Sequence, residues 1–125
     1  MMASKARLFG GDWTLSAILA TDDPREHKRL GRQVRRFDHD SWSRERENIV
    51  LQGNLAKFSQ NEDLRLTLLH TGDRRLAEAS LYDNMWGIGL KASDYRASSS
   101  SMWRGSNLLD PTLDQVRNTL CKNTP

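Results

Sequence analysis

The stretch with the strongest chemical content is EASLYDNMWGIGL, over residues 78–90, which holds two acids, a tyrosine and a tryptophan followed at once by Gly-Ile-Gly. A core segment gains little from two carboxylates, because burying an unpaired charge costs several kcal/mol, on the order of the whole stability of a small domain. An aromatic ring beside glycines and an acid fits a pocket in which a flat base stacks while a carboxylate faces a sugar. The stretch therefore predicts a ligand site that includes Asp83 and Trp86.

Asp83 also has a purely structural interpretation. Its side chain can cap a turn by accepting hydrogen bonds from the backbone, a common role for Asp before Asn. An acid in a cleft marks a functional site only in a statistical sense. The residues alone leave both interpretations open.

Gly87 and Gly89 flank Ile88, and glycines at this spacing let a backbone turn sharply or approach a ligand closely. The sequence around them lacks the strand, third glycine and helix of a dinucleotide-binding fingerprint, and it lacks the Gly-Lys-Ser of a phosphate-binding loop. We expect the two glycines to take part in substrate binding without either of these motifs.

The chain contains four tryptophans, Trp13, Trp42, Trp86 and Trp103. Trp13 belongs to a short amphipathic segment, which favours a place in the core. Trp42 stands at a helix start beside polar residues, and the other two fall in predicted loops. These three are the candidates for rings that face a ligand.

Other classes of site have little support. The three histidines, His27, His39 and His70, lack the paired spacing that a zinc site needs, so we expect no metal ion and no cofactor. The single cysteine, Cys121, can form no internal disulfide, which favours a reducing compartment. No apolar run approaches the roughly 18 residues of a membrane helix. The expectation is a cytoplasmic protein with no membrane partner.

Length and charge narrow the class of protein further. The 125 residues suffice for one domain, and 37% hydrophobic with 28% charged residues is typical of a folded chain. The net charge of +3 assists phosphate-bearing ligands without requiring nucleic acid. Residues 25–36 carry six basic side chains, which we interpret mainly as the solvated face of a helix, with one or two of them as candidates for lining a pocket. A nucleic-acid partner is not expected.

Apolar periodicity and helix-start signals predict a mainly α chain. The clearest start is Asp23 at a cap position, followed by Pro24 at the first helical position. Helices are expected over residues 1–9, in a short segment after Asp12, and over 24–36, 42–58 and 61–70. A last helix is expected from Pro111, with Asp110 as its cap, to a frayed end at 123–125.

Two segments are expected to be non-helical. Residues 76–79 lie between turns, are too few for a helix and are predicted to form a strand. Residues 92–104 contain four consecutive serines and are predicted to form a loop. The fold class is therefore mainly α, with one or two short strands in a single compact domain over residues 1–125.

The order of motifs along the chain resembles that of the NADAR family. The matching segments are KARLF at 5–9, DPREHKRLGRQVRRFDHDSW at 23–42, GNLAKFSQN at 53–61, LLHTGD at 68–73, EASLYDNMWGIGL at 78–90 and WRGSNLL at 103–109. They cover nearly the whole chain in one order, which is far more specific than any single motif. The best-described branch of the family is the YbiA-like N-glycosidases, which act on riboflavin-biosynthesis intermediates.

The resemblance implies a compact, mostly helical domain that hydrolyses an N-glycosidic bond between a ribose phosphate and a base-like amine. Related branches are linked to NAD and ADP-ribose, so the substrate class stays open within the family. The family's catalytic set includes a glutamate, a tryptophan and an aspartate, and Trp42 and Asp83 match the last two. Lys5 matches a lysine about two helical turns after the glutamate, on the same helix face, and is expected to meet the substrate phosphate.

The glutamate of the family has no counterpart, because its place would fall just before Met1. Relative to the family we therefore expect an N-terminally truncated domain. Losing a general acid or base lowers the rate by about 10²–10⁴-fold. The alternative function is a catalytically impaired module that binds ADP-ribose or a nucleotide, or a gene fragment.

Asn107, in the WRGSNLL motif, is a candidate for a hydrogen bond to the ligand. Its alternative is a role in fixing the loop around it. The sequence leaves these two roles open.

Overall fold

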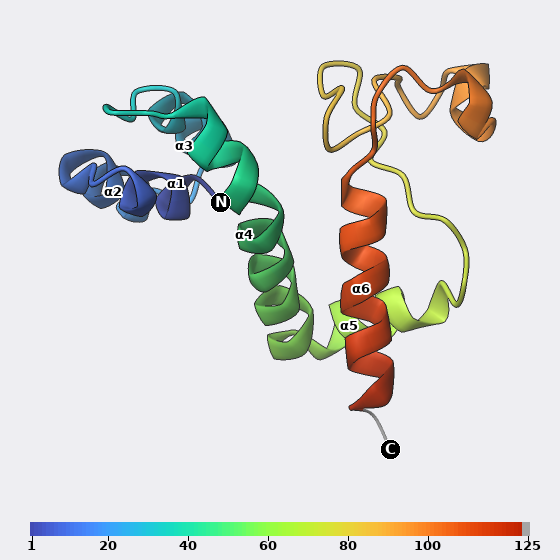
Figure 1. Ribbon diagram of the computed structural model, residues 1–125. Coiled ribbons are helices and arrows are strands. Elements are labelled where there is room, and N and C mark those ends of the chain that lie inside the picture. Colours follow the sequence, from blue (N-terminus) through green and yellow to red (C-terminus); the bar gives the residue numbers. More distant parts are fainter. Residues whose placement is uncertain (124–125) are drawn as a thin grey trace. The chain divides into compact units, whose positions relative to one another are not determined.

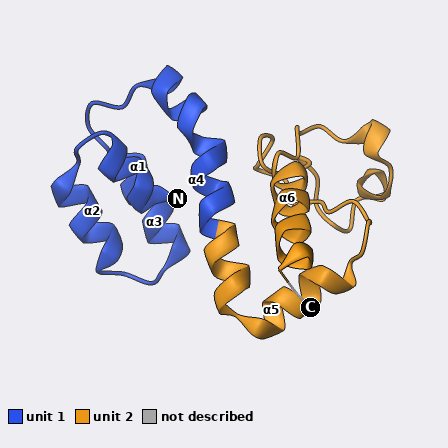
Figure 2. Ribbon diagram, turned by 60° about the horizontal axis from the view of Figure 1, so that its bottom comes forward, with its two compact units in different colours: residues 1–53 blue, residues 54–125 orange. Residues whose placement is uncertain are grey.

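The computed structural model of the protein describes residues 1–123 (Figure 1). Within them it contains six α-helices, two short 3-10 helices and no strand, which confirms the prediction of a mainly α chain. The chain divides into two compact units, residues 1–53 and the chain from Asn54 onward (Figure 2). No helix of the described chain is both long enough and apolar enough to span a membrane.

The first unit packs three short helices, α1 (Met2–Leu8), α2 (Asp12–Leu19) and α3 (Pro24–Gly31), and includes most of α4 (His39–Gln60). Its core is aliphatic. The buried members are Ala6, Ile18, Leu30 and Val34. Ala6 is completely buried, and its small side chain lets the helices around α1 approach closely.

The start of α3 follows the sequence prediction. The Asp23 carboxylate accepts a hydrogen bond of 2.9 Å from the backbone N–H of Arg25, and Pro24 occupies the first helical position. The helix ends at Gly31, earlier than the predicted end at residue 36, and the Met2 side chain packs directly against Gly31. Val34 is buried beyond that end, and Arg36 adopts a left-handed φ of 57°.

The second unit contains the end of α4, α5 (Glu62–His70), the 3-10 helices η1 (Tyr95–Ser98) and η2 (Ser100–Met102), and α6 (Leu109–Lys122). Helices α5 and α6 contact each other. The buried apolar residues of this unit are Leu68, Ile88, Leu90, Val116 and Leu120. Two of them, Ile88 and Leu90, lie in the loop region between α5 and α6 and not in a helix.

The predicted strand over residues 76–79 is wrong, because side chains occupy the backbone groups that a neighbouring strand would pair. The N–H of Leu76 donates to the Asp110 carboxylate at 2.9 Å, and its carbonyl accepts from the Asn107 amide at 2.9 Å. The N–H of Glu78 donates to the Asn107 carbonyl oxygen at 3.1 Å. The segment is extended but is held by polar side chains.

The last helix also starts differently from its prediction. Helix α6 begins at Leu109, and the carboxylate of Asp110 bonds to Leu76 instead of capping the helix. The predicted fraying at 123–125 falls partly outside the described residues, which end at Asn123, the C-cap of α6.

Candidate active-site residues in the two units

Asp83 lies in a half-buried turn of the second unit and uses one carboxylate oxygen to hold that turn. Its Oδ1 accepts hydrogen bonds from the N–H of Met85 at 3.0 Å and of Trp86 at 2.8 Å. Its Oδ2 accepts no hydrogen bond from any residue of the described chain. The carboxylate therefore combines the turn-capping role with one oxygen that is available to a ligand.

The turn is part of a loop network that is built from backbone hydrogen bonds. Ile88 donates its N–H to the carbonyl of Glu78 at 2.9 Å and accepts at its own carbonyl from Arg104 and Gly105 at 2.9 and 2.8 Å. Asn107 donates its N–H to the carbonyl of Gly87 at 2.9 Å. Segments from both ends of the α5–α6 connection are thus tied to the predicted ligand stretch.

Close backbone approach explains both glycines of this stretch. A Cβ at Gly87 would lie 2.7 Å from the carbonyl oxygen of Glu78 and 2.9 Å from that of Asp83. Gly89 has a left-handed φ of 71°, and a Cβ there would lie 2.5 Å from the side-chain oxygen of Asn84. Both glycines are buried. The close neighbours that they permit are other parts of this chain.

Asn107 is 2% exposed and has a left-handed φ of 49°. Its amide bonds to the backbone of residues 76 and 78, so both ends of the side chain are engaged. A buried amide with both ends satisfied fixes the loops around it. A hydrogen bond from this amide to a ligand would have to replace one of these contacts.

Two arginines that organise the second unit, Arg75 and Arg117, were not singled out in the sequence. Asp110 accepts from the Nε of Arg75 at 3.3 Å, and the Arg75 guanidinium lies 4.9 Å from the centre of the Trp103 ring. The buried Arg117 donates to the hydroxyl of Thr71 at 2.7 Å and to the carbonyl of Arg74 at 3.1 Å. These partners are distant in sequence, so no local pattern marks the contacts. Arg117 also pairs with Asp114, three residues before it in α6.

In the first unit, Lys5 and Trp42 are close to each other. The Nζ of Lys5 lies 5.6 Å from the centre of the Trp42 ring and 4.6 Å from that of Phe37. Partial burial lowers the pKa of the Lys5 ammonium. Lys5 forms no ion pair with any residue in the described range, so its charge is available to an anion.

Trp13 is not a core residue, contrary to its prediction. Its side chain is 72% exposed, because α2 turns the face with Thr14 and Ile18 into the core. Trp42, Trp86 and Trp103 are each half-buried.

Across residues 1–123, no group of three or more histidine, cysteine or acidic side chains is arranged to hold a metal ion. The Nε2 of His27 lies 2.6 Å from the carbonyl oxygen of Thr21, so this ring is engaged locally.

Comparison with known proteins decides the family. The NADAR domain model matches residues 1–121. The chain belongs to the NADAR family. The match spans both units, which confirms the resemblance that the motif order indicates.

Three curated relatives extend this result. The chain is 42% identical over 117 residues to N-glycosidase R617 of Acanthamoeba polyphaga mimivirus, a match that covers 94% of this NADAR chain and 69% of the relative. It is 40% identical over 121 residues to Protein irg-1 of Caenorhabditis elegans, a match that covers 95% of this chain and 57% of the relative. It is 34% identical over 100 residues to N-glycosidase Npun_R5314 of Nostoc punctiforme, a match that covers 80% of this chain and 57% of the relative. This NADAR chain thus spans less than two thirds of two of these relatives.

Proposed function

We propose that this chain is an N-glycosidase-type hydrolase that cleaves the N-glycosidic bond of a ribosylated, phosphate-bearing small molecule. The observation that carries the proposal is the 42% identity over 117 residues to a protein named N-glycosidase. A ribosylaminopyrimidine phosphate of riboflavin biosynthesis and an ADP-ribose-related compound are the two substrate classes. The proposal treats residues 1–125 as one NADAR domain.

Asp83 is the proposed catalytic carboxylate. Hydrolysis at a ribosyl carbon passes through an oxocarbenium-like state, and a carboxylate promotes it by stabilising positive charge or by orienting water. The two backbone hydrogen bonds to Oδ1 orient the side chain and leave Oδ2 for this task. Such support of a reacting group by fixed backbone donors is the usual requirement for precise catalysis.

The remaining site residues have proposed binding roles. In the first unit, Trp42 has the proposed role of stacking on the base and Lys5 that of meeting the phosphate, since Lys5 forms no ion pair within the described chain. In the second unit, Trp86 has the proposed role of stacking on the base. Gly87 and Gly89 shape the turn that carries Trp86, and Asn107 holds the backbone on which that turn rests. No metal or cofactor enters the proposal. A cytoplasmic location belongs to the proposal and is supported by the single cysteine, Cys121.

The test compares the wild-type chain with Asp83→Asn, using a ribosylaminopyrimidine phosphate and following release of ribose 5-phosphate. The asparagine oxygen can still accept the two backbone hydrogen bonds, so the turn is retained while the charge is lost. We expect the rate to fall by about 10²–10⁴-fold. Asp73→Asn is the matched control, because Asp73 is exposed in a turn of the same unit. Equal rates for wild type and Asp83→Asn would exclude Asp83 as a catalytic residue.

A second candidate function is binding of ADP-ribose or a nucleotide without cleavage. It is supported by Asp83 and Asn107, whose side chains hold the loops of the second unit through backbone hydrogen bonds. Calorimetry with ADP-ribose separates the two functions. Binding without release of product favours the module, and binding with release favours the enzyme.

A further inference from the structure

The first unit contains a cleft of about 810 Å³ that the proposed hydrolysis does not use. One wall is the turn between α1 and α2, residues 9–14, and the other is the turn after α3, where Gln33, Arg35 and Arg36 lie. Small-molecule sites typically have about 300–1,000 Å³. The cleft is therefore large enough for a ligand of several rings.

The cleft combines an exposed aromatic ring with two cationic side chains. Trp13 is 72% exposed, an unusual state for an indole, and it lines the cleft. Arg35 and Arg36 are exposed and form no ion pair with any residue of the described chain. One acid, Asp12, also lines the cleft, and two guanidinium groups outweigh its charge.

Fixed backbone positions hold the two walls in place. Gly11 donates its N–H to the carbonyl of Ala6 at 2.8 Å on one side, and the buried Val34 anchors the turn on the other side. The rings of Phe9 and Phe37 meet edge to face, with centres 5.2 Å apart, and so connect the two walls. The cleft is thus a formed feature of the first unit.

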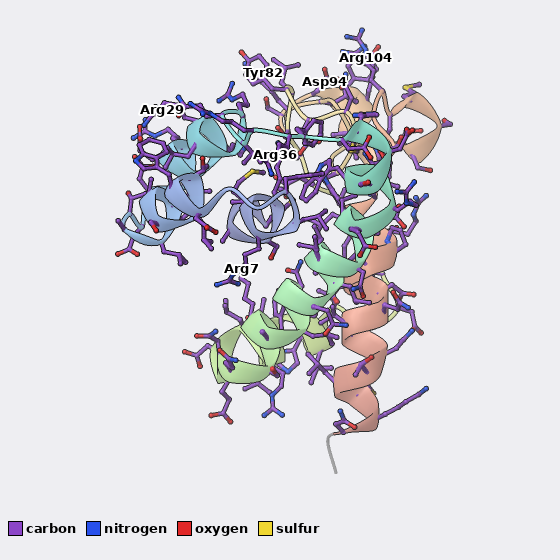
Figure 3. The ribbon with its side chains drawn as sticks, turned by 60° about the vertical axis from the view of Figure 1, so that its left-hand side comes forward. Arg7, Arg29, Arg36, Tyr82, Asp94 and Arg104 are labelled. Atoms are coloured by element: carbon purple, nitrogen blue, oxygen red, sulfur yellow. The ribbon has the colours of Figure 1, made fainter. Side chains whose placement is uncertain are left out.

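Arg36 has a backbone conformation that is costly for a residue with a side chain. Its left-handed φ of 57° is of the kind that costs about 1–3 kcal/mol and that gathers at ligand sites. Figure 3 labels this residue. Arg36 and its neighbour Arg35 both line this cleft.

We infer that this cleft binds a nucleoside 5′-phosphate, with the phosphate on Arg35 and Arg36 and the base stacked on the Trp13 indole. Guanidinium groups bind phosphate through paired, charge-assisted hydrogen bonds, and an exposed indole offers a flat face to a base. The side-chain amide of Gln33 supplies a donor and an acceptor for the base edge. The inference goes beyond the proposed hydrolysis, because Asp83, Trp42 and Lys5 do not line this cleft.

The test is titration with AMP, with adenosine and inorganic phosphate as separate arms, by calorimetry and by NMR of the indole N–H signals. The Trp13 signal is assigned by its loss in Trp13→Phe. We expect AMP to bind more tightly than either fragment and to shift the Trp13 signal. Replacing both arginines, as Arg35→Ala with Arg36→Ala, should weaken AMP binding at least about tenfold, the loss of one charge-assisted hydrogen bond.

Two controls keep the inference open to refutation. Arg7, labelled in Figure 3, is an exposed arginine of the same unit. It is not among the residues that line the cleft, so Arg7→Ala should leave AMP affinity unchanged. Circular dichroism should show that all variants are folded. AMP binding that is equal in wild type and the double variant, or a Trp13 signal that AMP does not move, overturns the cleft assignment. If the wild-type chain binds AMP but releases no ribose 5-phosphate, the proposed hydrolase function is refuted and the cleft assignment stands.

Discussion

The two units differ in how they use polar side chains, although both have aliphatic cores. In residues 1–53, Lys5, Arg35 and Arg36 remain without carboxylate partners in the described chain. In the second unit the buried Asn107 joins loop to loop, and the buried Arg117 joins α6 to the turn after α5. The comparison teaches that residue type alone does not mark a ligand site. What matters is whether the chain's own backbone already satisfies the side chain.

The difference also predicts where each unit is sensitive to substitution. A backbone-paired loop network fails when one member is removed, because its partners are left buried and unsatisfied. An exposed cation changes stability little when it is removed. The following predictions test this contrast, from the largest expected effect to the smallest.

Gly87→Ala should destabilise the chain by about 3 kcal/mol, since the new Cβ would force apart backbone carbonyls of Glu78 and Asp83. Gly53→Ala is the matched control, because Gly53 lies within α4 and a Cβ there would meet no atom within 4 Å. It should stabilise the chain by about 0.5–1 kcal/mol. Urea unfolding followed by circular dichroism measures both. Equal effects of the two changes would contradict the close packing at Gly87.

Asn107→Ala should cost about 2 kcal/mol, because it leaves the N–H of Glu78 and the carbonyl of Leu76 without their side-chain partner. The exposed Asn118 of α6 provides the control, and its change to Ala should alter stability by less than about 0.5 kcal/mol. Hydrogen exchange of the Glu78 amide gives a local readout. An amide whose protection is unchanged in Asn107→Ala would argue against the loop-fixing role.

Lys5→Met should change the free energy of unfolding by less than about 1 kcal/mol. The loss of the contacts with the Phe37 and Trp42 rings lowers this free energy, and the removal of a partly buried charge raises it. The pKa of Lys5 is lowered in the folded chain by burial, so the unfolded chain binds more protons between the two pKa values. Wild type should therefore gain stability relative to Lys5→Met as the pH rises through that interval. A difference that falls with pH would contradict the burial of this ammonium.

Arg96→Gln should give the smallest change in stability but a clear change in titration. Hydrogen bonds from the Arg96 side chain, and then from its backbone, lower the pKa of Asp94 to about 2 from 3.8. The resulting stability is present above pH 3.8 and is lost as the pH falls through about 2. Carboxyl NMR should show the Asp94 pKa rising in Arg96→Gln and rising less in Arg104→Gln, where only a weaker charge effect is removed. Equal shifts in both variants would exclude the hydrogen bond as the main cause.

The mainly α class, the helix start at Asp23 and the family were determined by sequence alone. They depend on short-range signals, namely apolar periodicity and side chains that cap the next turn, and on an order of motifs that needs no coordinates. The candidate residues Asp83, Trp42 and Lys5 were likewise found from their types and motifs.

The tertiary structure alone decided how those residues are used. The side chain of Asn107 bonds to Glu78 and Leu76, which precede it by 29 and 31 positions in the chain. These bonds use the backbone groups that a strand would pair, and they engage both ends of the Asn107 amide. The exposure of Trp13 depends on which face of α2 meets the core, and its place beside Arg35 and Arg36 depends on how the turns of the first unit pack. Such contacts join segments far apart in the chain, so no local pattern contains them.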